Sequence, residues 1–133
     1  MKNKLRKIIL NGFQYLYIVT DQYHSNTETN TLTIKVFLEG HKKTPLILDF
    51  LTIDHPYAGQ QLKSGVALIN KLSNTTEIVN LNEPKLIRQL ILKGLQNGWT
   101  GIDLLEKQDG LLYLSAMGYE IEILKPNRNH EQL

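Results

Sequence analysis

The chain has 133 residues, of which 15 are basic, 13 are acidic and none is cysteine, so its formal net charge is +2. This length suits one domain built around one core. The lack of cysteine excludes disulfides, thiolate zinc sites and cysteine nucleophiles, and it fits a reducing compartment. Because the charge is nearly balanced, the small basic surplus is only weak evidence for binding to polyanions.

The first residues, MKNKLRKIIL, have the basic opening of a secretory signal. However, Asn11, Gly12 and Gln14 interrupt the apolar run, and no cleavage site follows. No stretch approaches the roughly 18 uninterrupted apolar residues that a membrane helix requires. We therefore expect a cytoplasmic protein that does not enter the membrane.

Residues 6–19 contain two β-rich runs separated by an Asn-Gly dipeptide. This dipeptide favours a type I′ turn, in which both central residues have a positive φ. A two-residue loop would place Leu10 opposite Phe13. Both faces of the hairpin are largely apolar, which is typical of a central position in a sheet.

Polar and apolar stretches then alternate along the chain. Residues 21–30 are rich in Asn and Thr and predict an exposed loop. Residues 31–39 alternate apolar and polar side chains and predict a strand. Residues 45–53 predict another strand, which begins at Pro45 because the missing amide donor does least harm at a first position.

Residues 58–72 fit either a helix or strands. Apolar residues occur at helical spacing, but Ser64-Gly65 interrupts that pattern. The runs on either side of SNTT also suit a hairpin. We favour strands here.

Residues 82–97 predict a helix. Asn82 is the expected N-cap, Pro84 suits a first turn, and Gly98 supplies a left-handed exit. Trp99 follows directly, and we expect it to clamp the helix against the sheet with one acceptor for its indole nitrogen. The expected apolar stripe consists of Leu86, Ile87, Leu90, Ile91 and Leu95.

A second helical region is expected within residues 100–117. Residues 100–103 have the spacing of a capping box, Asp109 is positioned to restart a broken helix, and Gly118 follows the last apolar residue. Residues 119–124 alternate apolar and acidic side chains and predict a short final strand.

The order of elements indicates the fold class. Strands come first and helices follow, which argues for an α+β fold rather than an alternating dinucleotide-binding fold. We expect a mostly antiparallel sheet built from N-terminal hairpins, with the two C-terminal helices packed on one face. A single domain is expected over residues 1–125, followed by a flexible tail at 126–133.

The histidines give little sign of metal chemistry. No two are at helical i, i+4 spacing, and each is in a polar turn or in the tail: His24, His41, His55 and His130. No glycine-rich phosphate motif is present either, so neither a metal nor a cofactor is expected.

One loop carries a candidate acid/base cluster. Asp54, His55 and Tyr57 follow a predicted strand, at a position where binding groups often lie. The same Asp-His-Pro run is good turn chemistry, because Asp caps its own backbone and Pro fixes the next dihedral. The turn interpretation is favoured.

The outer face of the 82–97 helix is basic. Lys85, Arg88 and Lys93 lie there with Gln89 and Gln96, and no acid interrupts them. Such a band is typical of a solvated helix face, and also of a surface for nucleic acid or an acidic partner. Nucleic acid is the less favoured ligand, because no helix-turn-helix, zinc or RNA-binding pattern accompanies the band.

The run EPKLIRQLILKGLQNGW contains Pro84, Arg88, Gly94, Gly98 and Trp99. It resembles a segment of small uncharacterised bacterial α+β proteins of the immunity-protein type. Some proteins of that type bind and neutralise a toxin domain. The resemblance therefore implies a non-catalytic module whose partner is another protein.

Three functional hypotheses remain open at this stage. The favoured one is a protein-binding module, with an immunity protein as its sharpest form. The alternatives are a small enzyme that uses Asp54, His55 and Tyr57, and a weak nucleic-acid binder that uses the basic helix face. The oligomeric state is left open.

Overall fold

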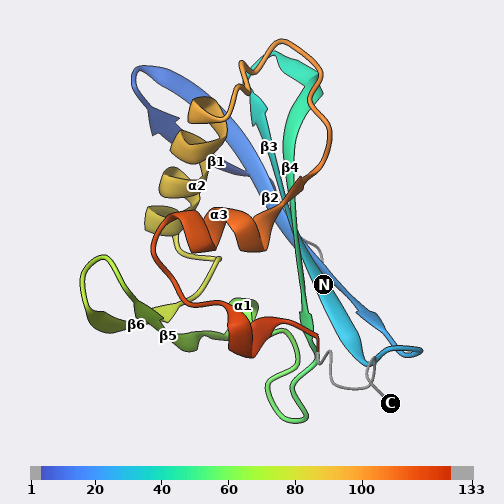
Figure 1. The fold of residues 1–133 in the computed structure, drawn as a ribbon. Helices are drawn as coiled ribbons and strands as arrows, with labels where there is room; N and C mark the ends of the chain where they lie inside the picture. Colours follow the sequence, from blue (N-terminus) through green and yellow to red (C-terminus); the bar gives the residue numbers. More distant parts are fainter. Residues whose placement is uncertain (1–3, 127–133) are drawn as a thin grey trace.

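The computed structural model describes residues 4–126 (Figure 1). In this part of the chain, a five-stranded sheet has the order β1-β2-β3-β4-β7, and β5 and β6 form a separate two-stranded sheet. None of the helices in residues 4–126 has the length and apolarity needed to cross a bilayer. The elements are β1 (Arg6–Leu10), β2 (Phe13–His24), β3 (Thr29–Leu38), β4 (His41–Ile53), α1 (Gln61–Ser64), β5 (Val66–Asn70), β6 (Thr75–Val79), α2 (Pro84–Gln96), β7 (Gln108–Asp109), α3 (Gly110–Ala116) and the 3₁₀ turn η1 (Glu122–Leu124).

The first hairpin forms as predicted. Asn11 and Gly12 have φ values of 54° and 84°, and Leu10 pairs with Phe13. The expected central position is wrong for β1, which is the edge strand of the sheet. Its outward side chain Ile9 is 63 % exposed. The central position that the apolar pattern predicts therefore applies to β2, which lies between β1 and β3, and not to β1.

The predicted loop at residues 21–30 is largely strand. β2 continues to His24 and β3 begins at Thr29, so that only residues 25–28 turn the chain. Threonine has a high strand propensity, and polar side chains suit a sheet face that meets water. Composition alone therefore overestimated the length of the turn.

β4 begins four residues earlier than predicted. The pairing with β3 shifts from Val36–Leu46 to Leu38–His41, and Pro45 lies within this irregularity. Proline is accepted in a strand at a bulge, where no ladder hydrogen bond is required from its nitrogen. Pro45 is therefore inside β4 rather than at its first position.

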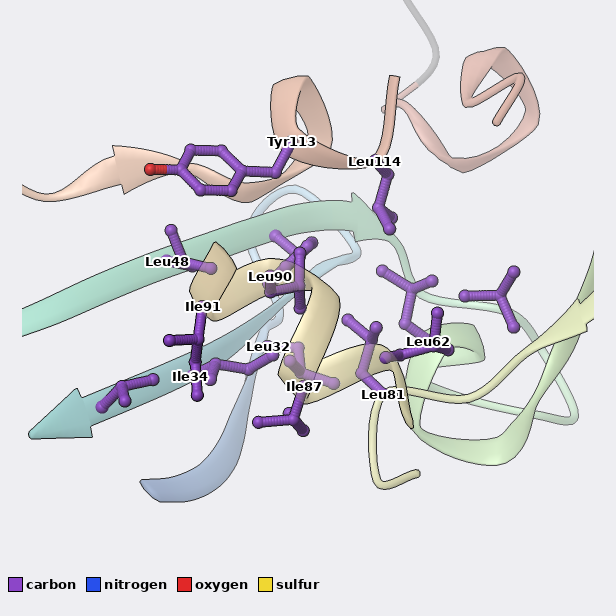
Figure 2. Close-up of a cluster of buried hydrophobic side chains, with 14 of the residues drawn as sticks. Leu32, Ile34, Leu48, Leu62, Leu81, Ile87, Leu90, Ile91, Tyr113 and Leu114 are labelled. Carbon is purple, nitrogen blue, oxygen red and sulfur yellow. The ribbon is translucent and has the colours of Figure 1, made fainter. Parts of the chain in front are cut away.

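Helices α2 and α3 lie on the same face of the large sheet (Figure 1). Gly94 of α2 contacts Leu46, and Gly110 of α3 contacts Phe50. Figure 2 shows the apolar side chains of both helices meeting β3 and β4. The strand side chains of this core include Tyr15, Tyr17, Leu32, Ile34, Val36, Leu46, Leu48 and Phe50. The fold is thus α+β with a mostly antiparallel sheet, and its covered face is now identified.

The ambiguous segment 58–72 contains both types of structure. Residues 61–64 form the short helix α1, whose cap is the Gln60 side chain that accepts from the Leu62 N–H. The favoured strand interpretation is confirmed for β5, which pairs with β6 as an antiparallel hairpin.

The helix prediction for residues 82–97 is confirmed, including its exit and its stripe, which is buried except for the partly buried Leu95. Gly98 has a φ of 110°. The predicted N-cap is wrong by one residue, because Glu83 occupies the cap and makes no side-chain cap bond. Asn82 is engaged elsewhere, since its amide donates to the Lys63 carbonyl at 3.4 Å.

Only the Thr100 half of the predicted capping box at residues 100–103 is present, and no helix follows it; the Asp103 side chain accepts from the Thr100 hydroxyl at 3.0 Å. The Thr100 hydroxyl accepts from the backbone N–H groups of Ile102 and Asp103. No α-helix begins there, and the chain reaches β7 before α3 starts. Asp109 then caps α3 by accepting from the Leu111 N–H at 3.0 Å, as predicted.

The predicted final strand over residues 119–124 is wrong. Tyr119 makes a single bridge to Asn70, and the chain then turns into η1. Ile121 and Leu124 are both buried, and their spacing of three suits one 3₁₀ turn. Alternation over so few residues did not separate a strand from a turn. The predicted tail beyond Pro126 lies outside the described residues.

Tyr113→Phe is expected to raise the free energy of unfolding by about 1 kcal/mol. Tyr113 is 4 % exposed, and among residues 4–126 its hydroxyl has no hydrogen-bond partner. Phenylalanine removes that unpaired group and keeps the ring. Urea unfolding measures the change, with Tyr119→Phe as the contrasting variant because the Tyr119 hydroxyl donates to Glu77 at 2.7 Å. A loss of stability in Tyr113→Phe would contradict the conclusion that the Tyr113 hydroxyl is buried without a hydrogen-bond partner.

Candidate functional site

A polar cavity of about 470 Å³ lies between α2, the β5–β6 hairpin and the end of α3. We call it the α2 cleft. Two of the three cations predicted on the basic helix face, Lys85 and Lys93, are part of its lining, whereas Arg88 is not. The wall formed by α2 consists of Lys85, Gln89, Leu92, Lys93 and Gln96.

The spacing of these residues explains how α2 forms one wall. Lys85, Gln89 and Lys93 recur every four residues and therefore share one side of the helix, over about 12 Å. The opposite stripe, with Leu86 and Leu90, is buried in the core. Packing of the apolar stripe thus turns the two lysines toward the hairpin.

The hairpin wall carries a negative charge. The Tyr119 hydroxyl donates to Glu77 Oε1 at 2.7 Å, and the Ser73 and Thr75 hydroxyls donate to Oε2 at 3.3 Å. The hydrogen bond from Tyr119 is the main cause that lowers the pKa of Glu77, and the charge of Lys85 adds to it. Burial, followed by the bond to Glu77, raises the pKa of Tyr119 to about 12. At neutral pH, Glu77 is therefore ionised and Tyr119 is neutral.

The hairpin wall is held against the end of α3 by backbone and side-chain bonds. The Lys71 N–H donates to the Gly118 carbonyl, and the Glu120 N–H donates to the Ile69 carbonyl, both at 2.8 Å. The Asn70 amide also donates to a carbonyl at the end of α3, at 3.4 Å. These bonds fix the hairpin against α3, so the cleft is preformed.

Within the described residues, neither Lys85 nor Lys93 forms an ion pair. The cleft thus presents two cations on α2 and one hydrogen-bonded carboxylate on the hairpin. Such an arrangement attracts anionic groups to the α2 wall, and the attraction weakens as salt increases.

The predicted acid/base residues lie together in one turn. The Asn30 amide donates to Asp54 Oδ1 at 3.1 Å. His55 Nδ1 accepts from the backbone N–H groups of Tyr57 and Ala58, each at 3.1 Å. The Tyr57 side chain is 96 % exposed. These contacts give His55 and Asp54 structural roles in the turn, and their use in catalysis stays a prediction.

A larger cavity of about 600 Å³ lies beside β4, β7 and the start of α3. Its central charges neutralise each other, because Lys107 Nζ lies 3.2 Å from Asp49 Oδ2. Asp49 also accepts from the Thr33 hydroxyl at 2.7 Å. This cavity therefore offers less free charge than the α2 cleft. In residues 4–126, no three His, Asp or Glu side chains gather as a metal site requires.

The sequence identified the α2 wall and missed the wall opposite. Glu77 and Tyr119 are 42 residues apart, and no local pattern connects them. Their contact depends on the hairpin docking against α3, which a linear sequence does not display. Comparisons of this chain with known protein-family models, curated proteins and solved structures found no match.

Proposed function

We propose that this protein is a non-catalytic protein-binding module that receives acidic side chains of a partner in the α2 cleft. The observation that carries the proposal is the pair Lys85 and Lys93, which face a preformed cavity without ion-pair partners in the described chain. Charge complementarity of this kind speeds association and selects partners.

The apolar groups at the cleft favour a polypeptide ligand. Leu72 lines the hairpin side and is 79 % exposed, and Leu92 lines the helix side. A protein interface combines apolar contact area with a polar rim, whereas a small inorganic anion uses only the charges. The cleft offers both apolar and charged contacts to a single segment of a partner polypeptide.

The sharper form of the proposal is an immunity protein of the cytoplasm that blocks a toxin domain. Its support is the resemblance of the segment around Pro84, Gly98 and Trp99 to proteins of that type, together with the preformed cleft. A cleft that is already formed in the free chain requires little reorganisation on binding, which suits a tight inhibitor. The acidic side chains of the toxin domain would then lie against α2.

Replacing Lys85 and Lys93 together with Glu is expected to weaken partner binding by about a hundredfold, which is about 2.7 kcal/mol. Both positions then repel the acidic groups that they attract in the native protein. The measurement is quantitative capture from the native host, compared between the native protein and the variant by mass spectrometry. Binding constants with the isolated partner follow.

The matched control is Lys42→Glu with Lys43→Glu, which changes the net charge equally at two exposed positions of β4. This control is expected to retain the partner. Equal loss in both variants would contradict a role for the cleft. Capture of nucleic acid instead of protein, with a steep dependence on salt, would favour the nucleic-acid alternative.

A further inference from the structure

One edge of the large sheet is open over half of β2. β1 pairs only with Phe13 to Tyr17, whereas β2 continues to His24. Residues 18–24 therefore have β3 on one side and no neighbouring strand among the described residues on the other. The short length of β1 creates this open edge.

The register shows which backbone groups face the open side. A two-residue turn makes Leu10 and Phe13 a hydrogen-bonded pair, so the odd-numbered residues of β2 bond toward β1. The even-numbered residues bond toward β3, as the bond from the Glu39 N–H to the Gln14 carbonyl shows. By this alternation, the N–H and C=O groups of Val19, Asp21 and Tyr23 point outward from the edge.

The opposite edge of the sheet is covered in part. β4 pairs with β7, the indole of Trp99 donates to the Thr44 carbonyl, and the Thr44 hydroxyl donates to the Gly101 carbonyl. Proteins also protect edges with lysine or proline. The sequence of residues 18–24, IVTDQYH, contains neither. Within residues 4–126, the open edge of β2 is thus unpaired and has neither lysine nor proline, although it carries the charge of Asp21.

We propose that the open edge of β2 binds an extended segment of a partner protein as an additional antiparallel strand in line with β1. Three backbone pairs supply the hydrogen bonds, from Val19, Asp21 and Tyr23. The side chains that select the segment are those of the same three residues. Val19 and the half-exposed Tyr23 favour apolar groups opposite them.

Asp21 favours a hydrogen-bond donor at the centre of the segment, because its charge is already paired with Lys63. Its Oδ1 is already 3.0 Å from Lys63 Nζ, and a carboxylate has a second oxygen that accepts further bonds. The residues of the partner segment that face β2 are therefore an apolar residue, a residue with a donor side chain and a second apolar residue. Residues that point away alternate with them. This surface is separate from the α2 cleft, and the proposal does not depend on the function proposed there.

The test uses the full chain labelled with ¹⁵N and the peptide acetyl-Thr-Val-Thr-Lys-Thr-Val-Thr-amide. Its lysine is designed to face Asp21, with a valine facing each of Val19 and Tyr23. Amide shifts should change at these three residues, and their hydrogen exchange should slow by about tenfold or more when the peptide is saturating.

Two N-methylated peptides provide the matched controls. Methyl groups on both valine nitrogens remove donors that face β2, and this peptide should not bind. Methyl groups on the two threonines that flank the lysine modify nitrogens that point away, and this peptide should bind as the parent does. Equal behaviour of the two methylated peptides, or shifts confined to the α2 cleft, would overturn the proposal. So would slow exchange of the three amides without peptide that depends on protein concentration, because a second copy would then occupy the edge.

Discussion

Trp99→Ala is expected to lower the free energy of unfolding by about 3–5 kcal/mol. Trp99 is 2 % exposed, and its indole N–H donates to the Thr44 carbonyl at 3.0 Å. Its ring also packs against Tyr15, with 5.8 Å between the ring centroids. Alanine removes the buried ring and the bond to β4 together. Domains of this size have total stabilities of about 5–15 kcal/mol, so the variant should be close to unfolding at room temperature.

Urea unfolding followed by circular dichroism measures this change without relying on tryptophan fluorescence. Trp99→Phe is the companion variant, because it keeps an aromatic ring and loses only the hydrogen bond and part of the volume. We expect its loss to be about half as large. A loss below about 1 kcal/mol in Trp99→Ala would mean that Trp99 does not close the core.

The helical half of this core was predictable because its signals are local. The stripe containing Leu86 and Leu90, the exit at Gly98 and the acceptor required by Trp99 all follow from helix periodicity and the chemistry of single residues. The Asn-Gly hairpin was predictable for the same reason. The helix stripe, its exit and the hairpin turn each depend on residues within a few positions of one another, whereas the identity of the Trp99 acceptor, Thr44, does not.

Strand limits were less predictable because sheet neighbours decide them. The polar residues between Asp21 and Asn30 look like a loop in sequence, yet most of them extend β2 and β3. Likewise, the sequence predicts a strand that begins at Pro45, whereas a bulge allows β4 to start at His41. In both places, pairing with β3 outweighs the local preference.

The candidate site was half predictable. Lys85 and Lys93 were identified by their helical spacing, and the structure places both at the α2 cleft. Glu77 and Tyr119 gave no signal, because their bond arises only when the hairpin meets the end of α3. A cleft between distant segments depends on tertiary structure. The residues of one wall therefore do not predict which residues form the other wall.

Gly110→Ala is expected to lower the free energy of unfolding by about 2–3 kcal/mol. Local propensity predicts the opposite sign, because alanine is favoured over glycine in a helix by up to about 1 kcal/mol in the interior and by less at a first position such as Gly110. Packing decides the sign here. A Cβ added at Gly110 would lie 2.5 Å from two ring carbons of Phe50, whose side chain is fully buried. A flat ring in a filled core has no free space into which it can turn.

A double-mutant cycle separates packing from propensity. Phe50→Leu removes the ring, so Gly110→Ala should cost less than half as much in that background. Ser115→Ala, at an exposed position of the same helix, is the propensity control and should be neutral or slightly stabilising. Urea unfolding of the four variants and the native protein gives all the required differences. Stabilisation by Gly110→Ala would mean that α3 can move away from the sheet. In that case, the close contact between α3 and β4 would not hold the end of α3 in its place at the cleft.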